Sequence, residues 1–180
     1  MKKIILAGGC FWGVEAYFKQ IKGVLDTSCG YANGNKENPT YREVCDGVAT
    51  HAEAVEILYD ENETNLDKIF EHFFRIIDPT TLNRQGHDVG VQYRSGIYYL
   101  DEETKEKAIE YINKEQAKYD KKIVVSVEPL TNYYLAEAYH QDYLDKNPTG
   151  YCHVDLSLAK EDEKKWREKI IFHGTLTLWA

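Results

Sequence analysis

The stretch IILAGGCFWGVEAYFKQI at residues 4–21 determines how the fold begins. Its short apolar run at residues 4–7 is typical of a buried strand. From residue 14 onward, apolar positions recur with the period of an amphipathic helix. The stretch therefore predicts a strand, a glycine-rich turn and a helix, with Cys10 at the helix start.

The position of Cys10 favours a reactive thiol. Backbone N–H groups at a helix start are unpaired, and the helix dipole favours negative charge there. We therefore expect the pKa of the Cys10 thiol to be lowered, which increases the reactive thiolate form. Most free cysteines are small core residues, and the adjacent Phe11 and Trp12 could equally fill a core. Two large aromatic residues directly after a Gly-Gly-Cys turn favour a nucleophile beside an apolar pocket.

Composition excludes several classes of protein. The chain has 180 residues, of which 43% are hydrophobic and 29% charged, as expected for one globular domain. A net charge of −8 without a Lys/Arg block argues against binding of nucleic acid or anionic membranes. No apolar segment is long enough to span a membrane, and the apolar run near the N-terminus is too short for a signal peptide. We therefore expect a cytoplasmic protein with reduced thiols.

The chain has four cysteines, Cys10, Cys29, Cys45 and Cys152. None forms a CxxC pair, so a structural zinc site is not expected. Cys29 lies in a strand pattern and Cys45 in a loop, and both are typical of inert thiols. Cys152 follows a glycine-containing segment and could reach back to Cys10, or it could be an uninvolved exposed thiol.

The remaining pattern predicts strands at 24–31, 51–59, 94–100 and 122–130, and helices at 66–77, 102–119 and 136–146. The order β-α-β-β-α-β predicts an α+β fold. We expect a two-layer sandwich with a ferredoxin-like split βαβ core and helices on one side of the sheet. Long loops at 32–46 and 80–92 are typical of functional segments.

Glu53 is a candidate proton donor. Strand alternation places it on the same face as Val55 and Ile57. If this face is interior, desolvation raises the pKa of the carboxyl and keeps it protonated near neutral pH. If Glu53 lies at a solvated strand end, it is an ordinary carboxylate, and the alternation leaves both possibilities open.

Three loop residues are further candidates, Tyr41, Tyr93 and Asp88. A phenol in a pocket can hydrogen-bond an oxygen without adding charge. Each tyrosine taken alone is equally typical of a surface loop, and Asp88 of an ordinary turn aspartate. Their chemistry therefore depends on whether the fold brings them to Cys10.

Long motifs of the chain resemble those of peptide methionine sulfoxide reductases of the A type. They run in order from the start of the chain to residue 157. The motifs are GCFWG at 9–13, NPTYREVC at 38–45, HAEAV at 51–55, DPT at 78–80, RQGHDVG at 84–90, QYRS at 92–95, HQDYL at 140–144 and GYC at 150–152. Their length and specificity identify the chain as a member of this family.

The resemblance implies thiol-dependent reduction of methionine S-sulfoxide, free or in proteins, without a metal or organic cofactor. It implies that Cys10 is the nucleophile and that Phe11 and Trp12 form the wall that binds the methyl group. It implies that Glu53, Tyr41 and Tyr93 bind and protonate the oxygen, and that Asp88 assists them. It also implies that Cys152 resolves the sulfenic acid of Cys10 as a disulfide, which thioredoxin reduces.

The C-terminus departs from the family pattern. No cysteine follows Cys152, so a second disulfide relay in the tail is not expected. We expect a catalytic domain over residues 1–158 and a C-terminal extension of unknown role over residues 159–180.

Two other classes of function remain possible. One is a thiol hydrolase in which Cys10 pairs with a histidine, namely His51, His140 or His153. The other is a non-enzymatic module that binds methionine-containing peptides through Phe11 and Trp12.

Overall fold

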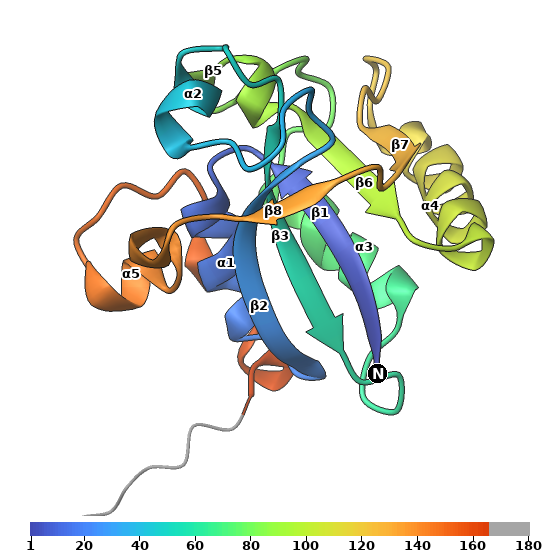
Figure 1. Ribbon diagram of the computed structural model, residues 1–180. Helices are drawn as coiled ribbons and strands as arrows, with labels where there is room; N and C mark the ends of the chain where they lie inside the picture. The colour runs from blue at the N-terminus through green and yellow to red at the C-terminus, as the bar shows by residue number, and fades with distance from the viewer. Residues whose placement is uncertain (166–180) are drawn as a thin grey trace, which may run out of the picture.

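A six-stranded sheet forms the centre of the computed structural model, which describes residues 1–165 (Figure 1). The strands follow the order β7-β6-β1-β3-β2-β8. Their bounds are β1 Lys2–Gly8, β2 Val24–Ala32, β3 Ala52–Tyr59, β6 Ser95–Tyr99, β7 Ser126–Pro129 and β8 Tyr133–Leu135. A separate short hairpin joins β4 Arg84–Gln85 to β5 Asp88–Val89.

The four central strands form the predicted split βαβ core. Strand β3 lies between β1 and β2 and runs antiparallel to both, while β6 pairs antiparallel with the other side of β1. Strand β7 extends the sheet parallel to β6, and β8 extends it antiparallel to β2. The predicted α+β fold with a ferredoxin-like core is therefore confirmed.

The helices are α1 Phe11–Lys19, α2 Tyr41–Cys45, α3 Leu66–Ile76, α4 Glu102–Glu115 and α5 Tyr143–Lys146. Single 3-10 turns include η1 Val91–Tyr93 and η3 Ala138–His140. Figure 1 shows α1 and α3 on the same side of the central strands. No helix within residues 1–165 is long and apolar enough to cross a membrane.

Alternation along the strands separates two buried faces of the sheet. Towards α1 and α3, the larger core includes Ile4, Leu6, Val55, Ile57, Phe18, Phe70 and Phe73. On the opposite face, the smaller cluster consists of Ile5, Ala7, Ala32, Ala52, Ala54 and Tyr98. Glu53 alternates with these alanines and therefore lies on the face that carries the larger core.

Two predicted elements near the C-terminal half differ from the structure. The single helix predicted at 136–146 is wrong, because Asp142 adopts the left-handed conformation with φ 55° and separates η3 from α5. The strand predicted at 122–130 is shorter, and the sequence pattern gave no sign of the three-residue strand β8.

The two predicted long loops also contain regular structure. Helix α2 lies within residues 32–46, and the Thr40 side chain caps it by accepting a hydrogen bond from the Glu43 N–H. The hairpin β4–β5 and turn η1 lie within residues 80–92 or directly beside them. These elements give the loop residues fixed positions at the ends of the central strands.

The predicted extension 159–180 is described only as far as residue 165. The Arg75 Nη1 atom lies 2.7 Å from Glu163 Oε2, and the Lys165 N–H donates to the Gln20 carbonyl. These contacts join the segment to α3 and to the end of α1. The apolar end of the sequence at 172–179 lies outside the described residues.

Candidate active site

Cys10 occupies the N-cap position of α1, directly after β1 and the turn at Gly9. Gly9 has a φ of +85°, and a Cβ built there would lie 2.7 Å from Gln85 Cβ. Glycine is therefore required for both the backbone conformation and the close approach of Gln85. The turn leaves the Cys10 side chain buried, with 6% of its surface exposed.

Glu53 extends from β3 towards the start of the same helix. Its Oε2 atom accepts a hydrogen bond of 3.0 Å from the Phe11 N–H, and only 1% of the residue is exposed. Burial raises the pKa of Glu53 to about 8, and the charge of Asp88 adds to this effect. The structure therefore places Glu53 in the interior, and its carboxyl is largely protonated at neutral pH.

The expected lowering of the Cys10 pKa is wrong for this structure. Burial raises the pKa of the thiol, and the charge of Glu53 raises it further. A hydrogen bond from the Trp12 N–H favours the thiolate but does not outweigh the desolvation. The site therefore holds a protonated thiol beside a protonated carboxyl.

Tyr41 and Tyr93 lie close to Glu53. Tyr41 begins α2 and Tyr93 ends η1, and both side chains are partly buried. Burial raises the pKa of each phenol, and the charge of Glu53 acts in the same direction on both. Asp88 adds to the effect on Tyr93. Both hydroxyls therefore remain neutral hydrogen-bond donors.

Asp88 lies on β5 at the edge of this group. Its Oδ2 atom accepts a hydrogen bond of 3.0 Å from the Tyr151 hydroxyl. Its charge raises the pKa of Glu53 and of Cys10. Asp88 thus helps to keep both groups protonated.

An aromatic cluster forms around Trp12. The Trp12 Nε1–H donates to His140 Nδ1 over 3.0 Å, and the Trp12 ring stacks on Tyr143 with 3.7 Å between centroids and 11° between planes. The buried His140 ring also lies 5.1 Å from Phe11 and 4.4 Å from Tyr41. An apolar aromatic surface therefore adjoins the thiol and the acid.

Cys152 packs against the first turn of α1. A Cβ built on Gly13 would lie 3.0 Å from Cys152 Sγ, so the missing side chain leaves room for the sulfur. The Cys152 thiol donates to the Val154 carbonyl over 3.1 Å, and a charge on Cys152 raises the pKa of Cys10. Both thiols are free. The structure thus brings Cys152 to the same helix turn as Cys10.

The model of the family described as peptide methionine sulfoxide reductase matches residues 2–170 of this chain. The chain belongs to the peptide methionine sulfoxide reductase family. This family consists of oxidoreductase enzymes, so the chain is classed as an enzyme.

Curated relatives support the family over most of the chain. Peptide methionine sulfoxide reductase MsrA of Clostridium acetobutylicum is 58% identical over 161 residues, which cover 89% of this chain and 99% of the relative. The MsrA of Alkaliphilus metalliredigens is 54% identical over 158 residues, which cover 88% of this chain and 100% of the relative.

Solved structures show the same fold. Mxr1 from Saccharomyces cerevisiae in reduced form gives a TM-score of 0.78 at 42% identity, covering 84% of this chain and 88% of Mxr1. Mxr1 in complex with Trx2 gives a TM-score of 0.55 at 29% identity, covering 79% of this chain and 84% of the Mxr1 chain. Methionine sulfoxide reductase A of Corynebacterium diphtheriae gives a TM-score of 0.76 at 39% identity, covering 84% of this chain and 77% of the reductase chain.

The other two cysteines of this reductase family member lie on β2 and α2, and the Cys29 thiol also reaches the Phe11 carbonyl at 3.8 Å. Cys29 is buried in β2, where its Sγ lies 3.3 Å from Glu15 Oε2. Cys45 ends α2, is exposed, and is hydrogen-bonded to Tyr41. Cys29 thus occupies a strand as predicted, whereas Cys45 lies in a helix at the edge of the site.

Two of the three histidines of the alternative hydrolase, His140 and His153, are hydrogen-bonded elsewhere. The third, His51, is buried with its ring 5.8 Å from that of Tyr134. His153 Nε2 is bonded to the Gly8 carbonyl at 2.9 Å, and His140 Nδ1 accepts from Trp12. In the part of the chain that the structure describes, none of the hydrogen bonds joins Cys10 Sγ to a histidine. This geometry gives the hydrolase hypothesis no support.

Two contributors to the reductase site were not assigned from the residue pattern. His140 and Tyr143 both contact Trp12, although 128 residues separate Trp12 from His140 in the sequence. Neither periodicity nor charge could identify this contact, because it depends on how the segment after β8 returns to α1. The motif at 140–144 is the only sequence signal for it.

Proposed function

We propose that this chain reduces methionine S-sulfoxide, free or in proteins, to methionine. The observation that supports this most strongly is the protonated Glu53 beside the buried Cys10 thiol. A sulfoxide oxygen must gain protons before it can leave sulfur, and a carboxyl with a pKa of about 8 can donate one at neutral pH. The aromatic surface around Trp12 suits the methyl group of the substrate.

In the first step, Cys10 Sγ attacks the sulfoxide sulfur while Glu53 protonates the oxygen, and the Glu53 carboxylate then takes up the proton of the Cys10 thiol. Tyr41 and Tyr93 hold this oxygen with neutral hydroxyls. The sulfur–oxygen bond of the substrate breaks and the oxygen becomes bonded to Cys10 Sγ as a sulfenic acid, while methionine departs with two electrons gained. The cysteine is oxidised by the same two electrons, so the step needs no metal or organic cofactor. Asp88 assists by keeping Glu53 protonated.

In the second step, Cys152 Sγ attacks the sulfur of the Cys10 sulfenic acid. Water leaves and a Cys10–Cys152 disulfide forms. The packing of Cys152 against Gly13 supports this pairing. Thioredoxin then reduces the disulfide by dithiol exchange. The solved complex of yeast Mxr1 with Trx2 supports thioredoxin as the reductant.

The proposal also covers the organisation and location of the chain. We propose a catalytic domain at 1–158 and a C-terminal extension of unknown role at 159–180. We propose a cytoplasmic location, where a dithiol reductant is present. Neither nucleic acid nor a membrane is a partner in this scheme, in keeping with the net charge of −8.

Turnover of the two epimers of a methionine sulfoxide substrate with dithiothreitol tests the proposed function. We expect reduction of the S epimer and little reduction of the R epimer, because a chiral pocket accepts one epimer and the family resemblance implies the S form. Turnover of hydrolase substrates without sulfoxide reduction would instead establish a thiol hydrolase. Peptide binding without any turnover, retained in Cys10→Ser, would establish a binding module.

A further inference from the structure

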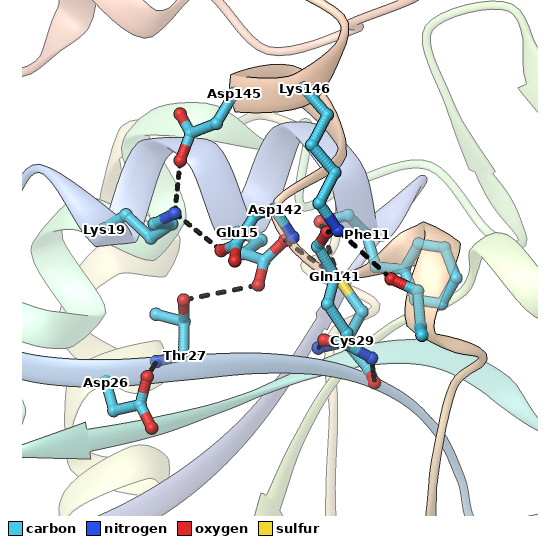
Figure 2. A network of polar contacts seen from close by, with 11 residues as sticks. Phe11, Glu15, Lys19, Asp26, Thr27, Cys29, Gln141, Asp142, Asp145 and Lys146 are labelled. Atoms are coloured by element: carbon cyan, nitrogen blue, oxygen red, sulfur yellow. Dashed lines mark hydrogen bonds and ion pairs between the residues drawn. The ribbon is translucent and has the colours of Figure 1, made fainter.

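Glu15 is a buried charged residue on α1 that takes no part in the proposed reaction. Only 1% of it is exposed, and three donors converge on its carboxylate (Figure 2). The Asp142 N–H lies 3.0 Å from Oε2, the Cys29 Sγ lies 3.3 Å from Oε2, and the Thr27 hydroxyl lies 3.4 Å from Oε1. Burial raises the pKa of Glu15, and the hydrogen bonds from Cys29 and Asp142 act against this effect. The carboxyl oxygens thus serve as the acceptors for all three donors.

The segment that Glu15 contacts is held from two sides. On one side, Gln141 pairs with the backbone of Cys29 in β2, accepting from its N–H at 2.8 Å and donating to its carbonyl at 2.9 Å. On the other side, Glu15 accepts from the backbone of Asp142, and Lys19 Nζ lies 2.6 Å from Asp142 Oδ1. Residues 141 and 142 therefore join β2 to α1.

This segment lies between the two residues that contact Trp12. His140, which accepts the Trp12 indole N–H, directly precedes Gln141. Tyr143, which stacks on the Trp12 ring, directly follows Asp142. Glu15 itself lies three residues after Trp12, about one helical turn further along α1. One carboxylate thus fixes the left-handed turn from which both supports of the indole extend.

We propose that Glu15 is a positioning residue, which fixes the Trp12 indole through the backbone of Asp142 and thereby sets the affinity of the site for the sulfoxide methyl group. This inference rests on the proposed role of Trp12 as the methyl-binding wall. The methyl group contacts the wall in both the ground state and the transition state. Loss of Glu15 therefore raises KM and leaves kcat nearly unchanged.

Two substitutions of Glu15 and one matched control test the kinetic part. Glu15→Leu cannot accept the Asp142 N–H, and we expect KM for the S-sulfoxide to rise about tenfold. Glu15→Gln keeps one carbonyl acceptor, and we expect a rise of about two- to threefold. The control is Glu115→Gln on α4, another buried glutamate, which packs away from α1 and should keep the original KM.

Tryptophan fluorescence provides a readout that does not depend on turnover. The chain has three tryptophans, so a background with Trp166→Phe and Trp179→Phe leaves Trp12 as the reporter. We expect Glu15→Leu to shift the Trp12 emission to longer wavelength and to increase its quenching by acrylamide. We expect Glu15→Gln to produce a smaller change in the same direction.

The combined outcomes separate this inference from the proposed function. A raised KM with altered Trp12 emission supports the inference. Unchanged Trp12 emission overturns it, whatever the kinetics, and so does a fall in kcat alone. Altered emission with an unchanged KM overturns the methyl-binding role of Trp12 and with it the effect on affinity. If Glu15→Leu does not fold, the two readouts on Glu15→Gln decide.

Discussion

Replacing Glu53 by glutamine removes the proton donor while keeping the shape of the side chain. The amide oxygen of glutamine can still accept the Phe11 N–H bond of 3.0 Å, so we expect the site geometry to persist. General acid catalysis typically contributes about 10²–10⁴-fold in rate. We therefore expect Glu53→Gln to slow methionine release in a single turnover by this factor, with little change in substrate affinity.

The same substitution has a calculable effect on stability. The pKa of Glu53 rises from 4.5 to about 8 on folding, so the folded state binds a proton that the unfolded state has released between these pH values. Each pH unit in this window lowers the stability of the wild type by about 1.4 kcal/mol. The stability of the folded protein is unaffected by this group below pH 4.5, and it falls as pH rises from 4.5 through 8. The loss is about 3 kcal/mol at pH 7 and reaches about 5 kcal/mol above pH 8.

Glutamine does not titrate, so Glu53→Gln escapes this loss. We expect the variant to gain stability relative to the wild type as pH rises from 4.5 to 8, by the amounts above. Urea unfolding of both proteins at several pH values measures the difference, and titration of the other groups largely cancels. A stability difference that stays constant across this window would show that Glu53 is not protonated in the folded protein.

Other substitutions test the assigned roles of the thiols. Cys10→Ser should abolish sulfoxide reduction, whereas Cys29→Ser and Cys45→Ser should retain most of it in the dithiothreitol assay; equal loss in Cys45→Ser would contradict the assignment. Gly13→Ala places a methyl group 3.0 Å from Cys152 Sγ. We therefore expect thioredoxin-driven turnover to become slower while the first turnover stays nearly unchanged. Equal slowing of both would refute this explanation. Cys152→Ser should release about one methionine per enzyme and then stop with thioredoxin as reductant; sustained turnover would exclude Cys152 as the resolving thiol.

The core of the fold could be predicted from local patterns. Alternation in β3 placed Glu53 on the same face as Val55 and Ile57, and the structure confirms that this face is interior. Helix α3 ends shortly before Pro79, where a proline is expected to end it. These features depend on neighbours within a few residues, so the sequence pattern contains them.

Features that depend on distant contacts could not be predicted. Strand β8 is three residues long and exists because its backbone pairs with β2. The left-handed Asp142 interrupts a segment whose pattern favours a helix, and Glu15 on α1 holds its N–H. The raised pKa of Cys10 reflects burial and the charge of Glu53, which outweigh the helix start that the sequence shows.

The central claim is that Cys10 is oxidised by the substrate and that Cys152 then closes a disulfide with it. Peptide mapping by mass spectrometry, after one turnover of the full chain with S-sulfoxide and without reductant, tests this most directly. We predict a loss of two hydrogens from the protein and a peptide pair linked through Cys10 and Cys152. A Cys10–Cys45 link, or no link at all, would contradict the claim.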